Sequence, residues 1–382
     1  MLVFRLKKPF IDIGEEEILS LFKKEIIKKK TLDNFFLCSL KDYKKYKKTK
    51  NLEKKISKIL AKRLGFCHEI YELILIADKK KFLEKLKKTN FLEYYKKDFC
   101  VRYKGFFYKE KEIADIVYKN LNYSLKKKIN KINKKNQKIK CKINQITVNL
   151  NNPKTKFVFY EIEDKILCLL FLNEADKTYN DRKAHLRPGF HPTSLSPELA
   201  RACINLTGLK KGIIFDPFCG TSGILIEAAL MEFYVIGNDI IKKQILYSKK
   251  NFDFYKIKNY KLYNKDILKF NFDLIFNNKA INNEIKNNKM KNKKIKNKKM
   301  KKAFSIVSDL PYGKGSYAKD LYELYENFLI KIKNYNYLKK IVLIFPDFVD
   351  YKKVIKKSGW KIKKEFYYYV HKSLTRVIVV LD

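Results

Sequence analysis

DPFCGTSGILIEAAL, residues 216–230, decides the fold of this chain. The residues just before it, 213–215, form a short apolar run that predicts a buried strand, and the apolar run from Ile224 onward predicts a helix. Between them lies a turn with two glycines, Gly220 and Gly223, which let a backbone bend sharply and approach a ligand. The stretch therefore predicts a strand, turn and helix unit whose main-chain amides face a ligand at the strand's carboxyl end.

A second apolar run, residues 234–237, predicts the next strand and ends in Asn238 and Asp239. Asp239 follows the glycine turn by about 20 positions, which is where nucleotide-binding folds place an acidic side chain on the ribose hydroxyls. The turn itself reads Gly-Thr-Ser-Gly and not the full G-x-G-x-x-G pattern. By itself it is equally compatible with a nucleotide-dependent oxidoreductase and with a methyltransferase.

The sequence SDLPYG, residues 308–313, separates these two classes. Residues 304–308 predict another buried strand, so the quartet Asp309, Leu310, Pro311 and Tyr312 stands at a carboxyl end, where open α/β sheets place their chemistry. The quartet resembles the (Asp/Asn)-Pro-Pro-Tyr signature of amino-methyltransferases. Taken alone, the same residues also fit an ordinary Pro-Tyr-Gly turn after a strand, and the glycine turn upstream favours the catalytic interpretation.

The signature suits an exocyclic amine on a nucleobase, which is a poor nucleophile because its lone pair is delocalised into the ring. Asp309 could accept one amine hydrogen and the Leu310 carbonyl the other, which would aim the lone pair at the sulfonium methyl of S-adenosylmethionine. Tyr312 would stack on the base, and Pro311 would stiffen the turn. Leu310 stands where the signature has its first proline, and a contact made by a main-chain carbonyl tolerates that change.

The order of glycine turn, acidic strand end and DLPYG resembles the THUMP-containing methyltransferases, and most closely the archaeal tRNA (guanine(10)-N2)-methyltransferase/dimethyltransferase family. The resemblance runs nearly end to end and implies an α/β fold: a class I (Rossmann-like) methyltransferase domain with a seven-stranded sheet, preceded by an α+β region. The other stretches that carry it are FRLKKPFIDIGEEEIL (4–19), AKRLGFCHEIYEL (61–73), FCVRYKG (99–105), VNLNNPKTKF (148–157) and DRKAHLRPGFHPTSLSPELARACINLTG (181–208).

By this resemblance we expect a ferredoxin-like segment at residues 1–50, a THUMP RNA-binding domain at 51–172, a linker at 173–187 and a methyltransferase domain at 188–382. In the family the THUMP region binds the acceptor stem and 3′ end of tRNA while the catalytic domain reaches the target base. A Lys- and Asn-rich segment, 277–302, interrupts the last domain, and its composition predicts disorder. A neutral expansion is favoured there over a cationic arm that follows tRNA.

The resemblance also implies contacts with the cofactor S-adenosylmethionine. Asp266 and Ile267 follow a third short strand, 261–263, where the family's fold holds the adenine ring, while Thr193 and Ser194 lie in a segment that shapes the pocket. Asp266 could instead cap the next turn, and the segment at 193–194 could instead be an ordinary helix cap. The full expected cofactor set is Asp216, Pro217, Gly220, Gly223, Asp239, Asp266, Ile267, Thr193 and Ser194.

The chain has 86 Lys and Arg against 40 Asp and Glu, which gives a formal net charge of +46 in 382 residues. Such a balance favours a polyanionic partner, because basic side chains that neutralise phosphates release counterions. Only seven of these residues are arginines, and the abundance of Lys, Asn, Ile and Tyr also fits the codon bias of an A and T rich genome. Arg102 and Arg187 are the candidates for bidentate RNA phosphate contacts, with a structural salt bridge as the alternative for each.

The seven cysteines form no C-x-x-C pair and the four histidines are scattered, so no metal site and no disulfide framework are expected. Cys219, two residues after Pro217, invites comparison with the Pro-Cys nucleophile of methyltransferases that attack pyrimidines, but it lies in the cofactor turn and an amine target needs no covalent adduct. The cysteines are therefore expected to be reduced core residues. The absence of a signal peptide or membrane span predicts a soluble cytoplasmic protein. A monomer is expected, and the sequence leaves open a small activating subunit.

Hydrophobic periodicity predicts further elements along the chain. In the N-terminal part these are strands at 2–6, 34–40, 69–76, 99–103, 148–158 and 166–172, and helices at 15–28, 52–64 and 80–88. Residues 126–140 are predicted to be a solvated basic helix face or loop. In the C-terminal part a helix at 320–330, a strand at 340–345 and an antiparallel hairpin of strands at 366–370 and 375–381 complete the sheet.

The predicted function is methyl transfer from S-adenosylmethionine to the 2-amino group of guanine 10 in tRNA, giving N2-methylguanosine and, after a second transfer, N2,N2-dimethylguanosine. A guanine of ribosomal RNA is the alternative substrate. A DNA adenine amino-methyltransferase is less favoured, because the N-terminal elements resemble RNA-binding modules. A non-catalytic RNA-binding protein is also disfavoured, because Asp216, Asp239 and Asp309 are intact. The sequence leaves open the number of methyl groups and the set of tRNAs.

Overall fold

The structure, a computed structural model, describes residues 1–22, 25–41, 52–134, 145–191, 194–275, 304–312, 318–333, 335 and 338–382. The chain divides into two compact units, here called the first and the second unit. The expected Lys- and Asn-rich insertion, Thr193, Gly313 and part of the basic stretch 126–140 lie outside the described residues. The first unit consists of Met1–Lys8, Glu25–Lys62 and Cys67–Ala175, and the second of Pro9–Lys24, Arg63–Phe66 and Asp176–Asp382.

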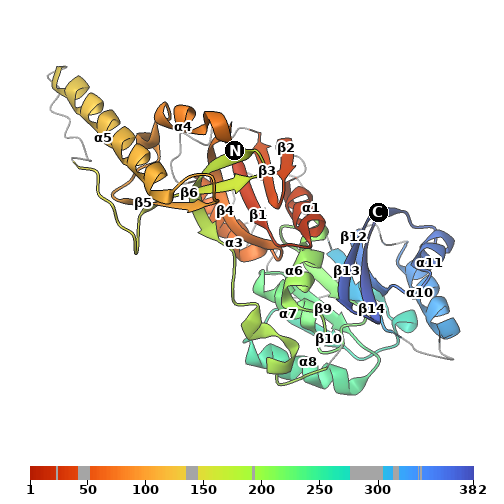
Figure 1. The fold of residues 1–382 in the computed structure, drawn as a ribbon. Helices are drawn as coiled ribbons and strands as arrows, with labels where there is room; N and C mark the ends of the chain where they lie inside the picture. Colours follow the sequence, from red (N-terminus) through yellow and green to blue (C-terminus); the bar gives the residue numbers. More distant parts are fainter. Residues whose placement is uncertain are drawn as a thin grey trace, which may run out of the picture. The chain divides into compact units, whose positions relative to one another are not determined.

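The first unit is built on a seven-stranded sheet of β1 (Leu2–Leu6), β2 (Ile26–Leu32), β3 (Phe35–Leu40), β4 (Cys67–Asp78), β5 (Phe99–Lys104), β6 (Thr155–Ile162) and β7 (Lys165–Glu174). The strand order is β2-β3-β1-β4-β7-β6-β5 (Figure 1). Because β1 pairs antiparallel with both β3 and β4, strands from the expected segments 1–50 and 51–172 belong to one sheet. The division of this unit into two domains stays a prediction.

The helices of the first unit are α3 (Leu52–Arg63), which continues to the edge of the second unit, α4 (Lys79–Lys87) and α5 (Glu110–Lys134). Helix α5 was not among the predicted elements; only the basic stretch 126–140, which it partly overlaps, was predicted to be a solvated helix face or loop. Four buried side chains spaced four residues apart, Ile113, Val117, Leu121 and Leu125, pack with Phe82 and Phe159. The same spacing continues to Ile129, which is partly buried against this cluster, so the core-facing side of the helix extends into the basic stretch.

The predicted helix at 15–28 is confirmed for residues 15–22, but its bounds are wrong. The structure has α1 (Ile11–Phe22) followed by the edge strand β2, which pairs antiparallel with β3 through a turn at Asp33 and Asn34. Asp33 takes a left-handed φ of 48°, which suits such a tight turn. The lysines of β2 are exposed, so this strand carries no alternating apolar pattern, and lysines on an edge strand also discourage pairing with other chains.

The predicted strand at 148–158 begins too early. Val148 forms an isolated bridge with Phe99, and β6 itself starts at Thr155. Between them Asn149 accepts hydrogen bonds from the amides of residues 151 and 152 at 3.2 and 3.0 Å, and Asp98 accepts from the Lys154 amide at 2.5 Å. These side chains accept hydrogen bonds from the backbone amides of a turn, so those amides do not pair with a neighbouring strand.

The second unit carries the predicted doubly wound sheet, of β8 (Ile213–Asp216), β9 (Tyr234–Asn238), β10 (Tyr260–Tyr263), β11 (Phe304–Asp309), β12 (Leu338–Pro346), β13 (Ile362–His371) and β14 (Leu374–Leu381). The order is β10-β9-β8-β11-β12-β14-β13 (Figure 1). The first five strands in this order are parallel, and β14 is antiparallel to both β12 and β13. The predicted fold class and the closing antiparallel hairpin are confirmed.

Helices cover both faces of this sheet. On one face, side chains such as Ile214, Val235 and Val342 pack against α6 (Pro197–Leu206), α7 (Gly223–Leu230) and α8 (Lys242–Phe254). On the other face, side chains such as Phe215 and Leu343 pack against α10 (Ala318–Ile332) and α11 (Tyr351–Lys357). Successive strand residues alternate between the two clusters, as the pleat requires. Burial on both sides leaves the carboxyl edge of the sheet as the place for a ligand.

The expected linker at 173–187 begins in the last residues of β7 and continues as part of the second unit. There Arg182 is buried and its Nε donates to Glu227 of α7 at 2.7 Å. Arg201 of α6 reaches the same carboxylate at 2.7 Å. Because these charges are buried, their pairing fixes the segment that leads into the catalytic motifs.

Glu17, on the buried side of α1, attaches this helix to the rest of the second unit. Its side chain is fully buried, and its carboxylate accepts hydrogen bonds from the amides of Gly65 and Phe66, each at 2.9 Å. The side-chain amide of Asn205 on α6 donates a third, at 2.8 Å, and Arg63 donates to Asn205 at 2.8 Å. One carboxylate therefore joins three segments that lie far apart in the sequence.

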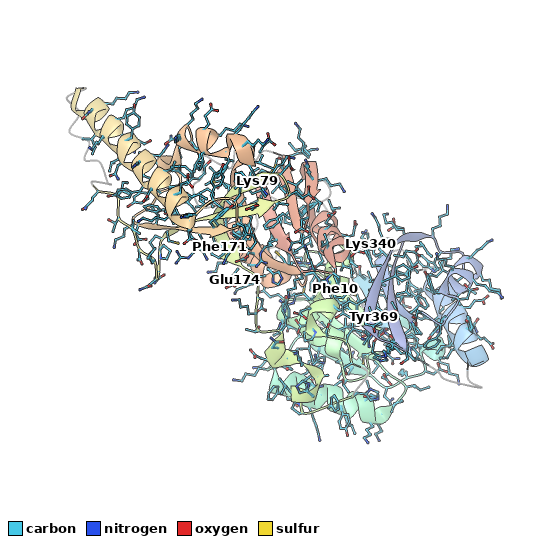
Figure 2. The ribbon with its side chains drawn as sticks, viewed as in Figure 1. Phe10, Lys79, Phe171, Glu174, Lys340 and Tyr369 are labelled. Carbon is cyan, nitrogen blue, oxygen red and sulfur yellow. The ribbon has the colours of Figure 1, made fainter. Side chains whose placement is uncertain are left out.

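Aromatic packing adds to this attachment. Phe10, labelled in Figure 2, stacks on Tyr368 of β13 with ring centroids 4.4 Å apart, and contacts Phe66 at 5.3 Å. Residues 9–24 and 63–66 thus belong to the second unit by both polar and apolar contacts, although strands of the first unit flank them in the sequence.

We expect Glu17→Gln to lower the unfolding free energy of the second unit by about 1–3 kcal/mol, because an amide group would turn toward backbone donors. Trp360 is the chain's single tryptophan and lies in the second unit, so its fluorescence during urea unfolding reports this unit alone. Glu323→Gln, at an exposed position of α10, is the control and should change stability by less than about 0.5 kcal/mol. Equal stability of the two variants would contradict the role of Glu17.

Candidate active site

A pocket of about 500 Å³ opens at the carboxyl ends of β8, β9, β10 and β11. It is of the size that small cofactors occupy in proteins. The structure brings into its lining all four predicted catalytic residues and every described member of the predicted cofactor set: Asp309, Leu310, Pro311, Tyr312, Asp216, Pro217, Gly220, Gly223, Asp239, Asp266, Ile267 and Ser194. Thr193 lies outside the described residues.

The glycine turn after β8 is closed by the acidic end of β9. Gly220 has a left-handed φ of 49°, and its amide donates to Asp239 Oδ2 at 2.9 Å. Asp239 Oδ1 accepts from the Ile241 amide at 2.8 Å. A Cβ placed on Gly220 would meet no atom within 4 Å, so the turn presents bare backbone to open space in the pocket.

Gly223 serves a different purpose from the predicted backbone bend. It is the first residue of α7, and the left-handed residue of the turn beside it is Ser222, with φ 67°. A Cβ on Gly223 would lie 2.9 Å from Nη1 of Arg187. Glycine therefore leaves room for a guanidinium packed against the first turn of the helix.

The interpretation of Arg187 as an RNA phosphate contact is wrong, because its side chain is only 4% exposed. Its Nε donates to the Arg182 carbonyl at 2.9 Å, and desolvation lowers its pKa. No sequence pattern marked this burial, since arginine is usually a surface residue.

The side chain of Arg102, in the first unit, is one-third exposed and contacts nearby residues of that unit. Its two terminal nitrogens donate to the carbonyls of Val101 and Leu150 at 2.9 and 3.0 Å, and Nη1 lies 3.8 Å from Glu110. These contacts support the structural alternative, in which Arg102 fixes the loop that contains Leu150. A phosphate contact by Arg102 stays a prediction.

Asp216 links the glycine turn to the catalytic strand. It is 2% exposed, and its Oδ1 accepts from the Ser308 hydroxyl at 2.6 Å and from the Phe218 amide at 3.1 Å. Burial raises the pKa of Asp216 to about 8, while the hydrogen bond from Ser308 opposes that rise. Ser308 immediately precedes Asp309, so this contact ties the two predicted motifs together.

Asp309, the last residue of β11, forms a closed set of contacts with Tyr312 and Arg376. The Tyr312 hydroxyl donates to Oδ1, Arg376 Nη2 lies 3.3 Å from Oδ2, and Arg376 Nε donates to the Tyr312 hydroxyl at 3.2 Å. Burial raises the pKa of Asp309 to about 6, and the positive charge of Arg376 lowers it. Sequence reasoning missed Arg376, although an arginine in a lysine-rich chain was an available signal.

The rest of the quartet is fixed by its backbone. The Leu310 amide donates to the Ile344 carbonyl of β12 at 3.1 Å, and the Tyr325 hydroxyl of α10 donates to the Pro311 carbonyl. The segment is thus anchored on both sides of its proline, which favours a rigid presentation of Asp309.

Three other pocket residues have local structural partners. Asp266 Oδ1 accepts from the Leu268 amide at 2.9 Å, so this residue caps the next turn, while its contact with the cofactor stays a prediction. Ser194 donates to the His191 carbonyl at 2.8 Å and lies 3.3 Å from the Thr221 hydroxyl. Cys219 is buried and desolvation raises the pKa of its thiol, which agrees with its exclusion as a nucleophile.

Comparison with known proteins identifies the family. A family model described as RMKL-like, methyltransferase domain, matches residues 184–378. A tRNA (guanine(10)-N2)-dimethyltransferase of Methanothermobacter thermautotrophicus is 30% identical over 330 residues, which are 85% of this chain and 85% of that protein. This chain belongs to that family. The protein is therefore a methyltransferase, and the resemblance drawn from its sequence is confirmed.

A second relative agrees with this assignment, and two further matches are broader. A tRNA (guanine(10)-N2)-dimethyltransferase of Pyrococcus abyssi is 30% identical over 239 residues, 62% of this chain and 64% of that protein. A second family model, described as DNA methylase, matches residues 7–250 and so ends before Asp309. The crystal structure of TrmN from Thermus thermophilus aligns at 15% identity and a TM-score of 0.43, over 100% of this chain and 99% of that one. The fold assignment rests on the strand order.

In the part of the chain that the structure describes, no helix has the length and apolar character needed to cross a bilayer. The same residues contain no group of three or more His, Cys, Asp or Glu side chains arranged to hold a metal ion.

Asp216 generates a prediction about pH. A carboxyl whose pKa is raised from 3.8 in the unfolded chain to about 8 in the folded one binds a proton on folding, so its contribution to stability is lost as pH rises through this window. Asp216→Asn removes this titration. We therefore expect the unfolding free energy of the variant, minus that of the wild type, to increase as pH rises from 4 to about 8, measured by Trp360 fluorescence during urea unfolding. A stability difference that does not change with pH would contradict the buried carboxyl.

Proposed function

We propose that this protein transfers methyl groups from S-adenosylmethionine to the exocyclic 2-amino group of guanine 10 in tRNA, giving N2-methylguanosine and then N2,N2-dimethylguanosine. The observation that carries the proposal is the position of Asp309, which stands at the end of β11 and lines the same pocket as the glycine turn after β8. Family membership narrows the substrate, since the relatives are named for that tRNA position.

The pocket residues fit S-adenosylmethionine. Gly220 presents bare backbone to the open pocket, and the carboxylate of Asp239 lines the pocket at the end of β9, where a ribose is bound in related folds. Ile240 and Ile241, at the mouth of the pocket, and the buried Ile267 offer apolar contacts for an adenine ring. When bound, the cofactor supplies an electrophilic methyl group on a positively charged sulfur.

The chain's own residues prepare the amine. Asp309 accepts one hydrogen of the guanine 2-amino group, and the Leu310 carbonyl is assigned the other, which turns the nitrogen lone pair out of conjugation with the ring. When the nitrogen gains a methyl carbon it must lose a proton, and the Asp309 carboxylate is the base in contact with it. Tyr312 provides a ring face for stacking on the base.

The first unit is proposed to bind tRNA, with a ferredoxin-like segment at 1–50 and a THUMP domain at 51–172. The large positive charge supports this, and so do the exposed lysines of the edge strand β2. A ribosomal RNA guanine and a DNA adenine remain the competing substrates. The match to a DNA methylase model, over residues 7–250, motivates a direct comparison with duplex DNA.

We expect Asp309→Ala to lower the rate of methyl transfer to tRNA by at least about 100-fold, because the amine loses its acceptor. The affinity for S-adenosylmethionine should stay within about threefold of the wild type, since an interaction made with the reacting amine contributes little to cofactor binding. Turnover is measured by nucleoside mass spectrometry on unmodified tRNA transcripts, with the modified position mapped by nuclease fragments.

The matched control is Asp347→Ala, which removes an exposed carboxylate just after the neighbouring strand β12. Its turnover should resemble that of the wild type. Wild-type turnover in the Asp309 variant would refute the catalytic role of this carboxylate. Methylation of ribosomal RNA or duplex DNA in place of tRNA would refute the proposed substrate.

A further inference from the structure

Arg376 lies in the site although no catalytic motif contains it. It is the third residue of β14, in register with Pro346 of β12, and β12 separates it from β11 in the sheet. Its side chain is 6% exposed and reaches the end of β11, where Nη2 lies 3.3 Å from Asp309 Oδ2. The guanidinium therefore comes to the reacting carboxylate from the antiparallel hairpin that closes the sheet.

The contacts made by Arg376 restrain two members of the catalytic quartet at once. Its Nε donates to the Tyr312 hydroxyl at 3.2 Å, and that hydroxyl donates to Asp309 Oδ1. Asp309 is thus held through both of its oxygens, one by a charge and one by a neutral hydroxyl. Each carboxylate oxygen has two lone pairs, so either oxygen can accept an amine hydrogen while these contacts persist.

We propose that Arg376 is the positioning residue of this site, which fixes the Asp309 carboxylate and the Tyr312 ring in the arrangement that receives the target amine. The proposal rests on the proposed function only for the identity of that amine. The restraint on Asp309 itself follows from the contacts among Asp309, Tyr312 and Arg376.

The electrostatic surroundings make this guanidinium necessary. Burial raises the pKa of Asp309, and Arg376 is the first of the opposing causes. Among the residues that the structure describes, the other titratable groups that interact with Asp309 or Arg376 carry no positive charge. They are Asp216 on β8, Tyr312 beside Asp309, Tyr325 on α10, Cys203 on α6 and Tyr368 on β13. A protonated Asp309 would be a weaker acceptor for the amine hydrogen and could not take the proton that the amine must lose.

The working range of the enzyme follows from this balance. Activity that needs the ionised carboxylate rises with pH through the pKa of Asp309, which is about 6. Removing the positive charge leaves burial unopposed, so the rise should move to higher pH by about one to three units. Lysine in place of arginine keeps the charge and loses the planar fork that contacts two partners, so it should preserve the pH profile better than the rate.

The test compares Arg376→Met and Arg376→Lys with the wild type. The pH profile of kcat/KM for tRNA is measured at saturating S-adenosylmethionine. We expect Arg376→Met to reduce kcat/KM at pH 7 by about 100-fold and to shift the acidic limb upward, and Arg376→Lys to recover the position of the limb. A reduced rate with an unshifted limb in Arg376→Met, or wild-type activity in that variant, would overturn the proposal.

Arg5→Met is the matched control, because it also removes an arginine from a carboxylate pair, that of Arg5 with Glu69 at 2.5 Å in the first unit. Its acidic limb should stay where the wild-type limb is. Folding of each variant is checked by Trp360 fluorescence, and Arg376→Lys keeps the test decisive if the methionine variant does not fold.

A second readout needs no RNA. In protein labelled with ¹³C at aspartate carboxyls, the Asp309 signal is assigned by its loss in Asp309→Asn, and its titration midpoint is measured in each variant. A midpoint moved upward in Arg376→Met supports the positioning role even if the wild type methylates no tRNA, in which case only the proposed substrate fails. An unmoved midpoint overturns the role of Arg376 whatever the substrate is.

Discussion

The hydrogen bond from the Ser308 hydroxyl to the buried Asp216 carboxyl is the contact on which the site depends. It joins residues 92 positions apart, at the carboxyl ends of the adjacent parallel strands β8 and β11. Because β8 carries the glycine turn and β11 carries the quartet, their adjacency sets the distance between the proposed cofactor site and the residues proposed to hold the target amine. The sheet order places the two strands together at its centre, and the Ser308 contact fixes their ends.

The site concentrates acidic groups in a protein of large positive charge. Asp216, Asp239 and Asp309 line one pocket, and burial raises the pKa of each. Burying three carboxyls close together lowers stability, and each is stabilised by a nearby group. The Ser308 hydroxyl donates to Asp216, backbone amides donate to Asp239, and the Arg376 guanidinium pairs with Asp309. A bound sulfonium would add a further favourable charge to a pocket already negative.

The sequence predicted most of this architecture because its signals are local. The strand, turn and helix at residues 213–230, the quartet after β11 and the closing hairpin each show a complete pattern within about twenty residues. Edge strand β2 was missed because its exposed lysines give no alternation of apolar and polar residues. The turn at Asp33 and Asn34 is its only local signal. Arg376 and Arg187 could not be placed from local patterns. The first reaches the site through the register of β14 on β12, and the second is buried against Gly223.

The central claim is that Asp309 presents the 2-amino group of one guanine for methylation. The most direct measurement compares methyl incorporation into tRNA transcripts that carry guanosine or inosine at position 10, because inosine lacks only that amino group. The account predicts incorporation at position 10 of the guanosine transcript and none at position 10 of the inosine transcript, with equal binding of both. Equal incorporation into the two transcripts would contradict it.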